Sequence, residues 1–257
     1  MKISVLGQLE LYGARGTIRI TARRQQVVLA TLIWNANRVV PIESLIDALW
    51  GATPPATARS QVHICVSGIR KRLVRSGLHR LLETEPPGYL ARVSPGELDL
   101  QIFDELVGKG RSLMSAHRPH EASRFLADAL ALWRGEPFAG VDSDRIRSIA
   151  AQLAERRIAA AEDYFELQIE LSRSADIVAD LTALVERYPF RERLRGELMI
   201  ALCQTGRQTD ALREYRNTRT LFVSELGVEP SWELRRLERD ILSGSARYGH
   251  FRIATPV

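Results

Sequence analysis

The sequence has 257 residues, of which 45% are hydrophobic and 26% are charged, and its formal net charge is +5. A chain of this length can bury a full hydrophobic core and is expected to form two domains. No apolar run approaches the about 20 residues that a membrane-spanning helix needs, and the opening segment 1–7 is too short for a signal peptide. We therefore expect a cytoplasmic protein with no membrane partner.

The positive charge is concentrated in the first third of the chain. Residues 1–95 contain 13 Lys and Arg against 5 Asp and Glu, a net charge of +8, whereas the remaining 162 residues have a net charge of −3. A GC-rich genome would also make a protein rich in arginine, but it would do so in both parts alike. The asymmetry predicts a polyanion-binding domain followed by a domain of another kind.

The first predicted elements are short. Apolar segments at 3–6, 9–12 and 18–20, separated by glycines, predict a small antiparallel sheet. A helix is predicted over about 23–35, and a second helix from Pro41, which suits a first helical position, to Gly51. Thr53, Pro54 and Pro55 then form a stiff link to a third helix, which is followed by a tight β-hairpin ending near residue 92.

The third helix is amphipathic and basic. Val62, Val66, Ile69 and Leu73 fall within about 60° on a helical wheel, so we expect them to face the core. A basic helix backed by a hairpin is typical of a winged helix-turn-helix protein, in which the helix enters the DNA major groove and the hairpin grips the flanking backbone. The alternative is a solvated helix face with one tolerated glycine. The candidate DNA-binding residues are Arg59, Ser60, His63, Ile64, Ser67, Gly68, Arg70, Lys71, Arg72, Arg75 and, in the hairpin, Arg92.

These candidates divide by chemistry. Ile64 is suited to contact a thymine methyl group. Gly68 costs the helix about 1 kcal/mol relative to alanine, and we interpret it as allowing a close approach of the backbone to DNA. Phosphate contacts are expected mainly from Arg70, Arg72 and Arg75, and base readout from His63, Ile64 and Ser67. Lys71 is a candidate for base readout that could equally contact a phosphate.

The second part of the chain is predicted to be all-helical. Apolar stripes lie at 102–107 and 125–133, and a long helix is predicted over about 144–172. Residues 198–215 fit half of a tetratricopeptide repeat, with a turn at Gly206, and 122–129 repeat part of it more faintly. On these patterns alone, a generic helical bundle is an equal alternative.

The sequence offers no enzyme motif. It has no glycine-rich phosphate loop, no Gly-x-Ser-x-Gly and no His-Glu-x-x-His. His117 and His120 are three residues apart, but no cysteine or further histidine lies near them. Cys65 and Cys203 fall in separate predicted helices and are interpreted as core thiols of a reduced protein. We therefore expect no catalytic activity, no metal and no cofactor.

Two resemblances follow from these residues. Residues 1–95 resemble the OmpR/PhoB-type winged-helix domain, with IRKRL (69–73) and PGYL (87–90) at its characteristic places. From about residue 2 to 244 the chain resembles the Streptomyces antibiotic regulatory protein (SARP) family, which consists of pathway-specific activators of secondary-metabolite gene clusters. The segments that carry this resemblance are Leu6-Gly7, LIDALWG (45–51) with Pro54-Pro55, ALWRGEPF (131–138), YPFRERL (188–194), GRQTDAL (206–212) and ELGVEP (225–230).

The resemblance implies a fold that is mainly α with a small β part. An OmpR-type winged helix-turn-helix domain is expected at 1–95 and an all-α, tetratricopeptide-like bacterial transcriptional activator domain at 96–244, with a tail of unassigned role at 245–257. The implied function is a sequence-specific transcriptional activator of an antibiotic biosynthetic gene cluster. It would bind direct repeats in double-stranded DNA near the promoter, as a homodimer or as tandem protomers.

The resemblance also implies a contact with RNA polymerase holoenzyme. The segment before the third helix would touch the sigma factor; the alternative is a rigid connector that only sets the angle between two helices. The competing function for the whole chain is a helical-repeat scaffold whose basic N-terminal domain docks an acidic protein partner. The polymerase-contact candidates are Thr53, Pro54, Pro55 and Ala56.

Overall fold

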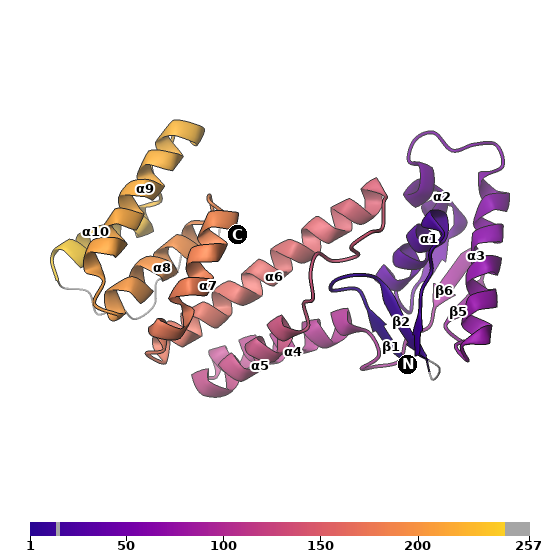
Figure 1. The fold of residues 1–257 in the computed structure, drawn as a ribbon, viewed down its shortest axis with the longest axis horizontal. Coiled ribbons are helices and arrows are strands. Elements are labelled where there is room, and N and C mark those ends of the chain that lie inside the picture. Colours follow the sequence, from indigo (N-terminus) through magenta and orange to yellow (C-terminus); the bar gives the residue numbers. More distant parts are fainter. Residues whose placement is uncertain (14–15, 245–257) are drawn as a thin grey trace. The chain divides into compact units, whose positions relative to one another are not determined.

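A computed structural model describes residues 1–13 and 16–244 of the chain (Figure 1). The predicted tail at 245–257 lies outside the described residues. The chain forms two compact units, the first made of residues 1–108 and 128–157, and the second of residues 109–127 together with the chain from Ile158 onward. Among the described residues, no helix combines the length and the apolar character needed to cross a membrane.

The first unit opens with the small antiparallel sheet that the glycine-separated apolar segments predict. Its strands follow each other in the order β1-β2-β3. Ile3 pairs with Leu11, and Leu11 pairs with Ile18, so that these three buried side chains line up across the sheet. The strands are β1 (Lys2–Ser4), β2 (Glu10–Gly13) and β3 (Gly16–Ile18).

Three helices follow and pack against one another in pairs. They are α1 (Arg23–Trp34), α2 (Ile42–Trp50) and α3 (Ala58–Arg75). In α1, all residues from Val27 to Ile33 are buried, because this helix is covered by both of the others. The second helix begins one residue later than predicted, since Pro41 has an extended ψ of 150° and ends a strand.

A second sheet closes over these helices. It consists of β4 (Val39–Pro41), β5 (Leu82–Glu85) and β6 (Gly88–Ala91), in the order β4-β6-β5. The hairpin β5–β6 agrees with the prediction, whereas the pairing of β4 with β6 was not anticipated from the sequence. Gly88 makes that pairing possible, because a Cβ at this position would overlap the backbone carbonyl of Val40.

The first unit also contains parts of the next three helices, α4 (Asp99–Ser115), α5 (Pro119–Ala131) and α6 (Asp144–Glu170). The buried carboxylate of Asp99 accepts the backbone N–H of Val5 at 2.9 Å and of Leu6 at 3.2 Å, and Arg134 donates to it at 3.0 Å. Asp99, at the start of α4 and four residues after the predicted boundary at residue 95, thus ties this helix to the segment that follows β1.

The second unit continues with α7 (Ser174–Arg187), α8 (Glu192–Gln204), α9 (Gln208–Leu226) and α10 (Trp232–Leu242), and consecutive helices pack together. Gly206 has a left-handed φ of 78°, as the predicted turn requires. The four apolar positions of the predicted half repeat are all buried: Leu198, Leu202, Ala211 and Tyr215.

A cluster of buried charges joins α6 to α8 in the second unit. Arg193 lies 3.0 Å from Asp163, 2.8 Å from Glu166 and 3.1 Å from Glu197. Both carboxylate oxygens of Glu197 are buried without a hydrogen bond of good geometry within the described residues. Burial raises the pKa of the Glu197 carboxyl well above its ordinary value of 4.5, and Glu162, Glu166 and Asp163 raise it further, although Arg193 acts in the opposite direction.

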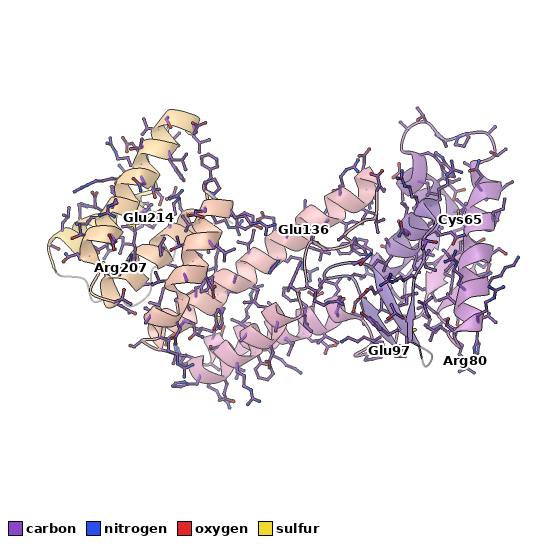
Figure 2. The ribbon with its side chains drawn as sticks, viewed as in Figure 1. Cys65, Arg80, Glu97, Glu136, Arg207 and Glu214 are labelled. Atoms are coloured by element: carbon purple, nitrogen blue, oxygen red, sulfur yellow. The ribbon has the colours of Figure 1, made fainter. Side chains whose placement is uncertain are left out.

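The two cysteines differ in burial. Cys65 is buried on α3, as predicted (Figure 2), and burial raises the pKa of its thiol. Cys203, on α8, is only half-buried, so the prediction of a core thiol is wrong in degree for this residue.

Candidate nucleic-acid interface

The helix α3 presents one buried and one open face. Val62, Val66, Ile69 and Leu73 are each at most 1% exposed, which confirms the predicted core stripe. They lie on the side of α3 that packs against α1 and α2. The residues that α3 leaves exposed on its other side include Ser60, His63, Ile64, Ser67, Lys71, Val74 and Arg75.

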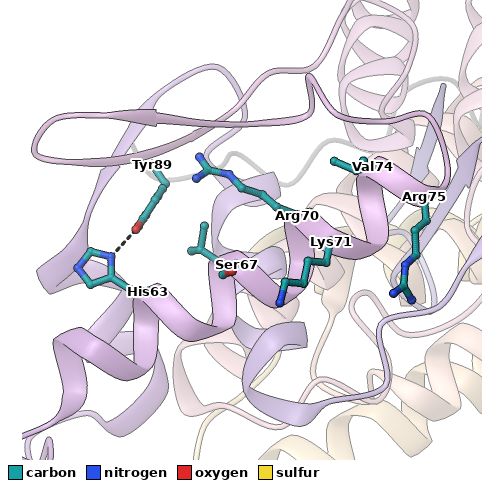
Figure 3. Close-up of a pocket in the computed structure, with 8 residues that line it drawn as sticks. His63, Ser67, Arg70, Lys71, Val74, Arg75 and Tyr89 are labelled. Atoms are coloured by element: carbon teal, nitrogen blue, oxygen red, sulfur yellow. Dashed lines mark hydrogen bonds between the residues drawn. The ribbon is translucent and has the colours of Figure 1, made fainter.

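An open groove of about 670 Å³ lies between the open face of α3 and Tyr89 of β6. Figure 3 shows His63, Ser67, Arg70, Lys71, Val74 and Arg75 projecting from α3, with Tyr89 facing them from β6. Five of these residues, all on α3, are among the DNA contacts predicted from the sequence. Three of the five, Arg70, Lys71 and Arg75, are positively charged. The groove is therefore positively charged on the helix side.

Tyr89 is the residue that sequence analysis missed. Its hydroxyl lies 2.6 Å from Nδ1 of His63, and the guanidinium of Arg70 lies 5.6 Å from the centre of its ring (Figure 3). The signal in the sequence that could have identified it is an aromatic residue directly after Gly88, in the predicted hairpin that backs α3. Tyr89 thus connects the hairpin to α3.

Arg70 is partly used by the hairpin. Its Nε donates to the carbonyl oxygen of Leu82 at 3.2 Å, and its Nη2 donates to Oγ1 of Thr84 at 2.8 Å. An arginine has five N–H donors, so the remaining ones stay available for a phosphate. Arg70 consequently positions the hairpin as well as carrying charge into the groove.

Three further predicted arginines have partners outside the groove. Arg72 donates to the carbonyl of Arg19 at 2.9 Å, and Arg59 forms an ion pair with Glu43. Arg92 binds Glu83 through two N–H groups at 2.9 and 2.7 Å, an interaction that raises the pKa of Arg92 and lowers that of Glu83. The structure therefore does not bring Arg59, Arg72 or Arg92 into the groove.

Gly68 makes a packing contact that the sequence did not indicate. It is half-buried, and a Cβ there would overlap the amide of Gln25 on α1. The glycine therefore allows close packing of α1 against α3. The close approach of its backbone to DNA stays a prediction beside this packing contact.

The loop between α2 and α3 is exposed to solvent along its whole length. Thr53, Pro54, Pro55 and Ala56 are all exposed. Two backbone hydrogen bonds fix the ends of the loop, from Thr53 N to Trp50 O at 3.4 Å and from Ala58 N to Pro55 O at 2.9 Å. In Figure 1 the loop joins the adjacent ends of α2 and α3, so that it borders the start of α3.

Two family models match the chain. Residues 16–91 match "Transcriptional regulatory protein, C terminal", and residues 98–242 match "Bacterial transcriptional activator domain". The regulatory protein DnrI of Streptomyces peucetius is 34% identical over 250 residues, which cover 94% of this chain and 92% of DnrI. The regulatory protein AfsR of Streptomyces coelicolor is also 34% identical, over 99% of this chain, but the chain spans only 25% of the length of AfsR.

The chain is also similar, in fold as well as in sequence, to a solved structure of a transcriptional regulator. The structure of Mycobacterium tuberculosis EmbR in complex with a low affinity phosphopeptide matches with a TM-score of 0.89 and 33% identity. The match covers 95% of this chain and 65% of the EmbR chain. The order of a winged-helix part and a helical part is therefore shared with a known transcriptional regulator.

Proposed function

Because the chain belongs to the Streptomyces antibiotic regulatory protein (SARP) family of transcriptional regulators, we propose that it activates a secondary-metabolite biosynthetic gene cluster by binding specific DNA near the promoter. The observation that carries the proposal is the basic groove between α3 and the hairpin. In this proposal, the winged-helix domain covers residues 1–95 and the activator domain residues 96–244. The protein would act in the cytoplasm, where it has access to the bacterial chromosome.

The open face of α3 supports this function. An α-helix with its side chains fits the width of the B-DNA major groove. Lys71 and Arg75 carry positive charge on this face, and Ser67 and His63 offer hydrogen-bonding groups on the N-terminal side of Lys71 (Figure 3). We assign Arg75 and Arg70 to phosphates, and His63, Ser67 and Lys71 to base edges, because phosphate contacts position a protein on DNA while base contacts give specificity.

The arginines outside the groove are proposed to make weaker contacts with the same DNA. Arg59 and Arg92 are engaged in ion pairs whose members are exposed, and such pairs are weak enough to exchange for a phosphate. Arg72 is half-buried, and Ser60 is exposed in the first turn of α3. We propose that these four residues contact the backbone of the flanking DNA.

The function is tested by a mobility shift on the promoter of a neighbouring biosynthetic gene, in the presence of competitor DNA. A shifted complex that survives competition is expected from the wild type. The double variant K71A/R75A should lose it, while R216A, an exposed arginine on α9, should retain it. A protein that binds no DNA specifically but captures an acidic protein partner would favour the alternative function, a helical-repeat scaffold.

Activation requires a second contact, which we propose for the loop 53–56. Thr53, Pro54, Pro55 and Ala56 are exposed, and two consecutive prolines give the loop a defined shape. Such a loop presents a fixed surface to the sigma factor of RNA polymerase holoenzyme. A rigid connector between α2 and α3 is the alternative, and the two differ in their effect on transcription.

The variant T53D/A56D separates these two roles of the loop. If the loop contacts the polymerase, the variant should bind the operator with wild-type affinity and lose activation in a purified transcription assay. The conservative variant T53S/A56S should keep both activities. Equal loss of binding and activation would show that the loop only positions α3, and loss of neither would remove the loop from the mechanism.

A further inference from the structure

The two most exposed large hydrophobic side chains in the described part of the chain both lie on α3. Ile64 is 67% exposed and Val74 is 61% exposed. Neither side chain contributes to the core, which the buried row of Val62, Val66, Ile69 and Leu73 supplies. Their presence on the face that carries Lys71 is therefore not explained by folding.

The two side chains are spaced along the axis of α3. Ten residues separate them, which corresponds to about 15 Å along a helix with a rise of about 1.5 Å per residue. A B-DNA strand advances about 3.4 Å per base, so the same distance spans about four base pairs. Ser67 and Lys71, which are also exposed, lie between them in the sequence of α3.

The major groove offers few apolar partners. Among the four bases, thymine alone presents a methyl group on its major-groove edge, and contact of an apolar side chain with this methyl is an established form of readout. The polar groups between Ile64 and Val74 suit other base pairs, since an ammonium such as that of Lys71 binds O6 and N7 of guanine. The stretch of α3 from Ile64 to Val74 thus begins and ends with an exposed apolar side chain and carries the polar Ser67 and Lys71 between them.

We propose that Ile64 and Val74 each pack against a thymine methyl group, and that the two contacted A·T pairs lie about four base pairs apart on either side of a pair read by Lys71. This inference rests on the proposed DNA-binding function. It makes Val74, which the sequence did not single out, a specificity-determining residue. It also gives the operator a chemical pattern before its sequence is known.

The experiment removes one methyl group at a time from the DNA. The wild-type full chain first selects its preferred duplex from a randomised library. Each thymine of that duplex is then replaced by deoxyuridine, which lacks only the methyl, and the Kd is measured by fluorescence anisotropy at constant salt. We expect two positions, about four base pairs apart, at which the replacement weakens wild-type binding about 4-fold, the factor expected from one buried methyl group.

Variants of the protein assign each position. In I64A, the replacement should no longer matter at one of the two positions, while the other remains sensitive; V74A should show the converse. L242A removes a side chain on α10 that is 60% exposed and should keep both sensitivities. Because all three side chains are exposed, we expect these variants to fold, and thermal unfolding verifies this.

The outcomes separate the inference from the function. If the wild type selects a defined duplex but no thymine shows a sensitivity that depends on Ile64 or Val74, the methyl readout is overturned and DNA binding stands. The same holds if the selected duplex has no thymine at such a spacing. If no duplex is selected at all, the proposed function itself fails.

Discussion

At the scale of single residues, charge and position have separable effects in the groove. Lys71 is exposed on the open face, whereas Arg70 donates hydrogen bonds to Leu82 and Thr84 of the hairpin. We expect K71A to reduce the magnitude of the log–log salt slope of DNA binding by up to about 1 and to leave stability unchanged. R70A should reduce the slope and also lower the free energy of unfolding by about 1 kcal/mol, since two hydrogen bonds to the hairpin are lost.

Titration of DNA at several salt concentrations measures the slope, and urea denaturation measures the stability. R216A is the matched control, because it removes an exposed arginine from α9 and should change neither quantity. Equal stability of R70A and K71A would contradict the positioning role of Arg70. An unchanged slope in both would contradict their assignment to DNA.

At the scale of elements, two glycines at packing contacts differ in how rigid their neighbours are. A Cβ at Gly88 would meet the backbone of Val40, which cannot move without opening the β4–β6 pairing. A Cβ at Gly68 would meet only the end of the Gln25 side chain. We expect G88A to destabilise the protein by about 1–3 kcal/mol. G68A should remain within about 1 kcal/mol of the wild type, because alanine also favours the helix.

Urea denaturation of both variants tests this difference, and DNA binding of G68A adds a second test. A stable G68A that binds DNA as well as the wild type agrees with the packing role. A stable G68A that has lost affinity would instead support the close approach of the helix backbone to DNA.

The buried charges between α6 and α8 make stability depend on pH. The raised pKa of Glu197 keeps its carboxyl protonated in the folded state at pH values where the unfolded chain has released the proton. The folded state therefore loses stability as the pH rises from the ordinary value of 4.5 through the raised pKa. E197Q, which stays neutral, should gain stability relative to the wild type over this range.

The free energy of unfolding of E197Q and the wild type at about pH 5 and about pH 8 measures this effect. E186Q, which changes an exposed carboxylate on α7, is the control and should follow the wild type at both values. A difference between E197Q and the wild type that does not grow with pH would show that Glu197 is ionised in the folded protein.

The elements differ in how far the sequence determines them. The core stripe of α3, the hairpin and the turn at Gly206 were predicted, because each depends on residues close together in the chain. The partners of Arg70, His63 and Gly68 were not, since they lie on other elements and depend on how these pack. The strand β4 was missed for the same reason: two valines and a proline form a strand only because β6 pairs with them.

At the scale of the whole molecule, the described chain corresponds to a segment that relatives of different length share. It spans 92% of DnrI but only 25% of AfsR. The basic groove and the helical second unit both lie within this shared segment. DNA binding and assembly on DNA are the activities that we propose for this segment, and both can be tested with this chain.

Assembly on DNA gives the last prediction. If the operator consists of direct repeats, as the family resemblance implies, two protomers would lie head to tail, and such a heterologous interface joins different surfaces of the two copies. Cooperative binding then requires both repeats on the same side of the duplex. Insertion of about 5 base pairs, half a helical turn, should abolish cooperativity, and insertion of about 10 base pairs should restore part of it. Footprinting titrations of both repeats measure the coupling. Cooperativity that survives the half-turn insertion would contradict the head-to-tail arrangement, because contact between the protomers could not then depend on the face of the DNA that each one occupies.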